Sequence, residues 1–267
     1  MKDMSASREE RRREPSRGRH AGTLARFPAG IAIMSWRYLW RTCPLHRTET
    51  EGDHTDLPPR TPPEYTDSRS KALKDGSGPM FHRTFTIWIE GSSLEPDQLM
   101  TALTADLNRA APSVAAVFTK TLGDNGAIRV GDEYRVQMPG PWDGPVRVVH
   151  RDATSFRFQT LSGHLEAGQI EFRARVGHDH SRGAGGGTRD GDRLLVFEVE
   201  AWSRAGDRWA EFLYSRLRVA KEIQLNMWVH FCLRAAAIAG GKPRGGVTIE
   251  TRSIPASHCR EAPAGQG

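Results

Sequence analysis

The stretch from Gly163 to Gly241 constrains the fold of this chain more than any other part of the sequence. It contains a glycine-bounded turn, a strand, a glycine-rich loop, a second strand and then one long helix. A strand pair that leads into a single long helix with an apolar face predicts a curved antiparallel sheet gripping that helix. The helix carries one apolar stripe at three-to-four spacing, made of Trp209, Leu213, Leu217, Ala220, Ile223, Met227, Phe231 and Ala235.

Alternating apolar residues predict further strands upstream of this stretch. The full set of predicted strands covers residues 81–90, 127–138, 146–150, 155–161, 169–176 and 194–202. Between the first two, leucine spacing after Pro96 predicts one helix, and Pro112 begins a second short helix that includes Val117 and Phe118. The predicted fold class is therefore α+β, a helix-grip fold. Its curved antiparallel sheet has about six or seven strands around a long C-terminal helix, with two short helices after the first strand.

Composition divides the chain into five parts. They are a disordered basic arm (1–21), an aromatic segment expected to be helical (22–43), a proline-rich linker (44–79), the helix-grip domain (80–241) and a loose tail (242–267). The first part is too polar to offset the entropy of ordering by burying apolar surface. The linker assignment rests on its Pro, Thr, Asp and Ser content.

The charge distribution argues against a nucleic-acid partner. The net charge is +6, yet residues 1–50 carry 11 Lys and Arg against 5 Asp and Glu, and the remaining 217 residues carry 27 of each. A folded nucleic-acid binder needs a basic face on the domain itself. Cys43, Cys232 and Cys259 are far apart, so they indicate neither a disulfide framework nor a zinc site. Cys232 lies in the long helix, where we expect a small buried hydrophobe.

The chain also lacks the usual signals for secretion and for a cofactor. The apolar run before Trp36 spans about ten residues, half of what crosses a bilayer, and no small-residue cleavage motif follows it. His178, Asp179 and His180 lack a third fixed ligand, so no metal site is predicted, and the Gly183–Gly187 run precedes a strand rather than a helix. We expect a cytoplasmic protein without a cofactor.

Two segments resemble a known family. The GHLEAGQIEF segment at Gly163–Phe172 and the segment from Phe197 to Trp228 are similar to those of the bacterial domain of unknown function 1990 family. That family lies within the START-like helix-grip superfamily of lipid-transfer proteins, polyketide cyclases and birch-pollen-allergen-like proteins. The resemblance covers roughly residues 80–240 and departs at Gln169, where the family commonly has an acidic residue. It implies a fold with an apolar cavity and no established activity.

The candidate site residues follow from these patterns. Five residues are predicted to contact a ligand: Tyr134, Phe156, Phe158, His164 and Met227. His164 and Glu166 are the catalytic candidates, because a His beside an acid can shuttle protons. The alternative is that both shape a glycine-bounded turn, which is the reading we favour. For Glu171, Arg173, Glu198 and Glu200 we expect cross-strand pairing on the solvated face rather than an acidic cavity wall.

Three functions remain open at this level. The first is non-covalent binding of a hydrophobic or amphipathic small molecule, including a lipid. The second is a cyclase or hydratase that uses His164 and Glu166 for proton transfer. The third is an adaptor at a membrane surface, where Trp36, Tyr38 and Trp40 would make a peripheral contact.

Overall fold

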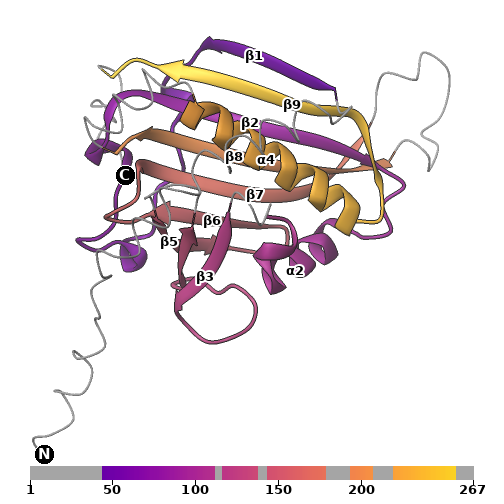
Figure 1. Cartoon of the computed structure of the whole chain (residues 1–267), viewed down its shortest axis with the longest axis horizontal. Coiled ribbons are helices and arrows are strands. Elements are labelled where there is room, and N and C mark those ends of the chain that lie inside the picture. Colours follow the sequence, from indigo (N-terminus) through magenta and orange to yellow (C-terminus); the bar gives the residue numbers. More distant parts are fainter. Residues whose placement is uncertain (1–43, 112–115, 138–142, 179–192, 207–218, 257–267) are drawn as a thin grey trace, which may run out of the picture.

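The computed structural model describes residues 44–111, 116–137, 143–178, 193–206 and 219–256. Within them, nine strands form one curved sheet in the order β1-β9-β2-β8-β7-β6-β5-β4-β3 (Figure 1). All neighbours are antiparallel except β1 and β9, which are parallel. The strands are β1 (Leu45–Glu51), β2 (Ser77–Glu90), β3 (Val117–Leu122), β4 (Glu133–Gln137), β5 (Asp143–Arg151), β6 (Ser155–Thr160), β7 (Glu166–His178), β8 (Arg193–Ala205) and β9 (Lys242–Ile254).

The helix α4 (Val219–Ile238) lies across one face of this sheet, and the shorter α2 (Pro96–Ala105) lies near its C-terminal end (Figure 1). Pro96 at the first turn of α2 suits a helix start, because that position needs no backbone N–H donor. Short 3-10 turns complete the described elements, namely η2 (His54–Asp56), η3 (Pro63–Tyr65), η4 (Leu73–Asp75) and η5 (Leu107–Arg109). The predicted α+β helix-grip fold is confirmed, with two or three more strands than expected.

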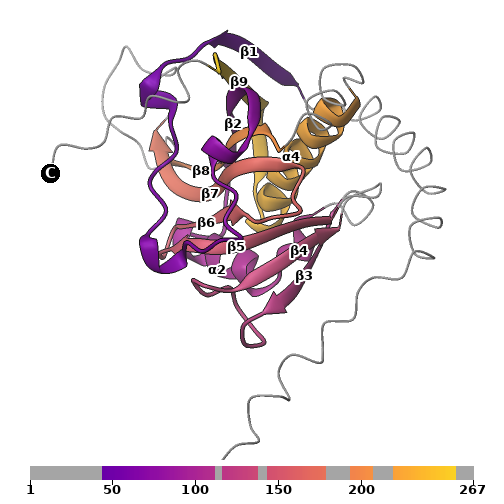
Figure 2. The ribbon, with the colours of Figure 1, turned by 90° about the vertical axis from the view of Figure 1, so that its left-hand side faces the viewer.

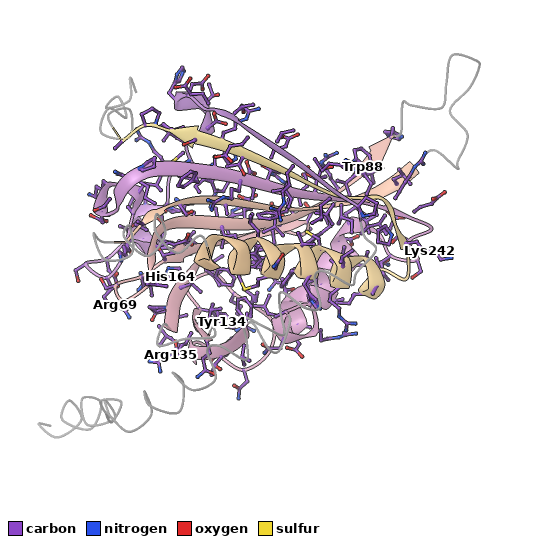
Figure 3. The ribbon with its side chains drawn as sticks, turned by 45° about the horizontal axis from the view of Figure 1, so that its top comes forward. Arg69, Trp88, Tyr134, Arg135, His164 and Lys242 are labelled. Carbon is purple, nitrogen blue, oxygen red and sulfur yellow. The ribbon has the colours of Figure 1, made fainter. Side chains whose placement is uncertain are left out.

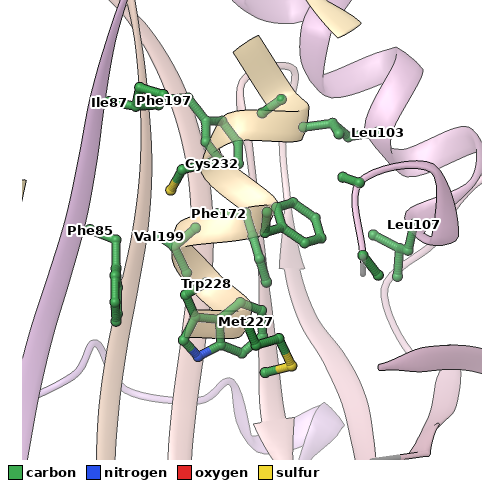
Figure 4. Packing of buried hydrophobic residues seen from close by; sticks show 14 of the residues in the cluster. Phe85, Ile87, Leu103, Leu107, Phe172, Phe197, Val199, Met227, Trp228 and Cys232 are labelled. Atoms are coloured by element: carbon green, nitrogen blue, oxygen red, sulfur yellow. The ribbon is translucent and has the colours of Figure 1, made fainter. Parts of the chain in front are cut away.

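The alternation along each strand explains which face the helix covers. On β2, Phe85, Ile87 and Ile89 are fully buried, whereas the residues between them are partly exposed. Phe172 of β7 and Phe197 of β8 point to the same side and contact Phe231 of α4 (Figure 4). We call this side the inner face of the sheet and the opposite side the outer face. Because side chains alternate along a strand, the residues on either side of Phe172 in β7 and of Phe197 in β8 lie on the outer face.

The predicted loose tail is wrong over its first half. Residues 242–254 form β9, which pairs with β2 on one side and with β1 on the other. Val247, Ile249 and Ile254 are buried, so this strand belongs to the core. The long helix is therefore followed by a strand that lies between β1 and β2 in the sheet. Residues 257–267 lie outside the described residues.

The predicted linker at 44–79 is also wrong. Its first residues form β1, its last residues begin β2, and Asp56 between them is almost fully buried. We call residues 52–76 the strap. It runs along the outer side of the sheet, away from α4, as Figure 2 shows in indigo and purple. The proline-rich composition could not reveal the tertiary bonds that fix this segment.

Two smaller predictions need correction. Val117 and Phe118 were assigned to a second short helix but lie in β3. The strand predicted at 127–138 begins only at Glu133, because Gly131 has a left-handed backbone with φ of 92° that turns the chain. Cys232 is buried as expected. The predicted arm, the aromatic segment with Trp36, Tyr38 and Trp40, and the first apolar positions of the long helix lie outside the described residues.

Candidate functional site

The interior between α4 and the sheet is lined by aromatic rings. Phe156 stacks on Phe172 at 4.7 Å between ring centroids, and Phe158 contacts both of them edge-on. Tyr134 packs edge-on against Phe158 at 5.8 Å, and burial raises the pKa of its hydroxyl. The predicted contact residues Tyr134, Phe156 and Phe158 therefore come together in one cluster. Met227 is also buried, on α4 (Figure 4).

One polar group stands out in this apolar interior. The indole of Trp228 packs edge-on against Phe172 at 5.6 Å, and only 7% of the residue is exposed. Its Nε1 donor has no hydrogen-bond partner within the described part of the chain. In Figure 4 that nitrogen lies on the edge of the ring turned away from Phe172 and Phe197. On the same helix, the side-chain oxygen of buried Asn226 also lacks a partner among the described residues.

The His164 side chain bonds to its own turn. Its Nδ1 accepts a hydrogen bond of 2.9 Å from the Glu166 backbone N–H, and its carbonyl accepts one of 2.7 Å from Lys71 Nζ. Burial lowers the pKa of the imidazole, which favours the neutral form that can accept this bond. Figure 3 shows His164 at the end of the molecule opposite Trp88 and Lys242. The geometry suits a residue that shapes the turn, and its role toward a ligand stays a prediction.

The close approach of β7 to β8 explains why position 168 of the same motif is a glycine. A Cβ added there would lie 1.9 Å from the Trp202 carbonyl oxygen, and the backbone φ of 152° disfavours other residues. The motif therefore allows β7 to approach β8 closely. Glu166 is buried at the start of β7, and its backbone N–H is the one that binds His164.

A second candidate site lies on the outer face, where sequence reasoning placed only paired surface charges. A partly open pocket of about 360 Å³ forms between the strap and the strands β2, β5, β6, β7 and β8. We call it the outer pocket. Its lining residues are Thr55, Leu57, Pro59, His82, His150, Arg157, Glu171, Arg173, Glu200 and Trp202.

His82 connects the strap to the sheet in this pocket. Its Nδ1 lies 2.9 Å from Asp56 Oδ1 and its Nε2 lies 2.7 Å from Glu200 Oε1. Ionised carboxylates only accept hydrogen bonds, so both ring nitrogens must donate and the ring is an imidazolium. Burial alone would lower the pKa of His82, but the bonds to Glu200 and Asp56 outweigh it and raise the pKa. The ring also stacks on Trp202 at 5.3 Å and an angle of 9°.

The charges of the outer face pair across strands, as expected. Arg157 Nη1 donates to Glu171 at 3.2 Å, Arg173 donates to Glu200, and Arg175 pairs with Glu198 at 3.0 Å. Glu171 and Glu200 face each other across β7 and β8. Their carboxylates would repel each other unless cations lie beside them. The expectation of a purely solvated face was incomplete, because Arg157 and Glu171 are buried and line the outer pocket together with Arg173 and Glu200.

The strap has a second anchor near β4 and β5. Glu133 binds Arg147 and Arg69 at 2.6 Å each, and the first pair is more than nine-tenths buried. Arg147 also donates to Asp67 at 2.8 Å and to the Tyr65 carbonyl at 3.0 Å. The Arg147 bond holds the pKa of the Asp67 carboxyl far below its usual range. These bonds fix the strap over the sheet and leave its path well defined.

The described residues form neither a cluster of metal ligands nor a helix that could span a membrane. They contain no group of three or more His, Cys, Asp or Glu side chains placed to hold a metal ion. None of their helices is both long and apolar enough to cross a bilayer. Asp179 and His180 of the motif at 178–180 lie outside the described residues.

Comparison with known families agrees with the resemblance drawn from the sequence motifs. Residues 102–232 match the family model described as a domain of unknown function (DUF1990). The resemblance to this family is confirmed. The match covers the sheet from β3 to β8 and most of α4, and it includes the His164 turn. A comparison with curated proteins gives no match.

Solved structures with a similar arrangement include Ara h 8.0201, with 14% identity, a TM-score of 0.36, and coverage of 61% of this chain and 99% of that one. A hypothetical protein from Helicobacter pylori has 9% identity, a TM-score of 0.35, and coverage of 66% and 95%. Major latex-like protein 151 from Panax ginseng has 16% identity, a TM-score of 0.29, and coverage of 55% and 97%. The fold assignment itself rests on the sheet order and on α4.

Proposed function

We propose that this protein binds a hydrophobic or amphipathic small molecule between α4 and the inner face of the sheet, without chemically transforming it. The observation that carries the proposal is the unpartnered indole N–H of Trp228 in an aromatic interior. A buried donor without a partner costs about 1–3 kcal/mol, so an acceptor atom on a bound molecule would relieve that cost.

The surroundings define the class of ligand that fits. Phe172 and Phe231 contact the Trp228 ring, and Met227 is its neighbour on the helix. Aromatic and thioether side chains favour an apolar, polarisable ligand body. One polar atom in such a lining is the usual means of orienting a ligand. A molecule with a mostly apolar body and one hydroxyl or carbonyl group matches both features.

The proton-transfer alternative has less support. The Nδ1 atom of His164 is already engaged by a backbone N–H, and its lowered pKa disfavours the cationic form that a general acid needs. Neither Trp228 nor Asn226 is an acid or base in the physiological range. We therefore infer binding rather than catalysis.

Two probes that differ by one hydroxyl group test this proposal. 2-Naphthol and naphthalene would be titrated into the full chain by isothermal calorimetry. We expect 2-naphthol to bind about 3–10-fold more tightly, because one hydrogen bond contributes about 0.5–1.5 kcal/mol. In Trp228→Phe the ring remains but the N–H is lost, so the two probes should bind equally.

The matched control is Trp202→Phe, which removes an indole N–H on the outer face. This variant should retain the preference for 2-naphthol. Failure of both probes to bind up to their solubility limits would refute the proposal. So would an unchanged preference in Trp228→Phe, because the unpartnered donor would then have no part in binding.

A further inference from the structure

We propose that the outer pocket is a separate binding site for a small organic carboxylate with an apolar part. This pocket is independent of the interior, because its lining lies on the opposite face of the sheet. Its volume of about 360 Å³ lies within the range of roughly 300–1,000 Å³ found for small-molecule sites. The strap supplies one wall, and five neighbouring strands supply the rest.

Two buried donors indicate that the ligand carries hydrogen-bond acceptors. Trp202 and Arg157 line this pocket and are only 4% and 7% exposed, and each has a buried side-chain donor, Nε1 of Trp202 and Nε of Arg157. Neither nitrogen has a hydrogen-bond partner among the described residues. Leaving such donors unpaired is costly, and a carboxylate offers two oxygens with several acceptor positions. A guanidinium N–H bonded to a carboxylate is also among the stronger hydrogen bonds in proteins.

The charge balance indicates that the ligand is an anion. The residues that line the pocket include four basic side chains, His82, His150, Arg157 and Arg173, and two carboxylates, Glu171 and Glu200. Both carboxylates already have an arginine partner. An excess of basic groups around a pocket favours an anionic ligand.

The remaining wall is suited to the apolar part of the ligand. Trp202 and His82 form a flat stacked pair, and the strap contributes Leu57 and Pro59. Flat rings and aliphatic side chains favour a planar apolar group. An aromatic or short aliphatic carboxylate would place its charged end near Arg157 and its apolar end near these residues.

Benzoate is the probe, and benzyl alcohol is its neutral counterpart. Each would be titrated into the full chain while the indole N–H signals are followed by NMR, with the Trp202 signal assigned from Trp202→Phe. We expect saturable benzoate binding at about millimolar concentration and at least about tenfold weaker binding of benzyl alcohol. The Trp202 signal should shift and the Trp228 signal should remain in place.

Calorimetry on variants locates the contacts. Trp202→Phe keeps the ring and Arg157→Lys keeps the charge, and each removes one of the two unpartnered donors. We expect each to weaken benzoate binding by about fivefold or more, whereas Trp228→Phe should change it by less than about twofold. A denaturation curve for each variant confirms folding.

Three results would overturn the proposal. They are the lack of saturable benzoate binding, equal binding of benzyl alcohol, and unchanged benzoate affinity in both Trp202→Phe and Arg157→Lys. The outcome does not depend on the interior ligand, because the naphthol probes are uncharged and the Trp228→Phe control measures benzoate binding with the interior donor removed.

Discussion

Replacing His82 with Phe should destabilise the protein in a pH-dependent way. The Phe ring keeps the stacking on Trp202, so the change removes only the two hydrogen bonds to Asp56 and Glu200. A bond to a charged group contributes about 1.5–3 kcal/mol. Both carboxylates keep another cationic partner, Arg252 for Asp56 and Arg173 for Glu200. We therefore expect a total loss of about 2–4 kcal/mol rather than the sum of two full bonds.

The sign of the pH dependence follows from the raised pKa of His82. The unfolded ring titrates near pH 6.5, so its stabilising effect is complete below about that value. It is lost as the pH rises through the higher pKa of the folded state, because one of the two bonds then lacks a proton. The difference between wild type and His82→Phe should therefore be largest near pH 6 and smaller near pH 9.

Urea denaturation of both proteins across this pH interval measures the effect. His150→Phe serves as the control, since that histidine also lies in the outer pocket but its side chain is 39% exposed. It should change the free energy of unfolding by less than about 0.5 kcal/mol. A difference between wild type and His82→Phe that stays constant or grows with pH would show that His82 is not the imidazolium bridge.

Three further variants test other parts of the structure. Gly168→Ala should cost about 3 kcal/mol or more, because its Cβ would overlap the Trp202 carbonyl, whereas Gly163→Ala meets no atom closer than 3.7 Å and should cost less in the same melting experiment. Glu133→Gln should lower the free energy of unfolding by about 3 kcal/mol, since it leaves buried Arg147 underpaired. A loss no larger than that caused by removing one partner of an exposed ion pair would contradict this. His164→Ala should lose about 1 kcal/mol of stability with unchanged 2-naphthol affinity, and the opposite result would assign His164 to the ligand site.

The helix-grip core could be predicted because its signals are local. Alternation on β2, β7 and β8 and the apolar positions of α4 each follow from the periodicity of one element. The predicted contact residues Phe156 and Phe158 are adjacent in the interior for the same reason, since they are two residues apart on one strand. The end of the helix at Gly240 could also be predicted, because glycine readily adopts the left-handed backbone that ends a helix. Gly240 has this conformation, with a φ of 71°.

The strap and the outer pocket could not be predicted in the same way. Asp56 lies in a polar, proline-rich stretch, and its burial depends on His82 and Arg252, which are far away in sequence. Paired charges on β7 and β8 look the same in sequence whether they face water or a covering segment. For β9, the alternation of Val247 and Ile249 was a usable signal, but the polar composition from Lys242 onward suggested a loose tail.

Native mass spectrometry of the full chain purified from cells tests the central claim most directly. Binding of an amphipathic molecule in the interior predicts protein that carries a small organic molecule, released on activation and identified after solvent extraction. Added 2-naphthol should displace it in wild type and do so less well in Trp228→Phe. Protein that is free of any such molecule and retains no 2-naphthol adduct would contradict the account.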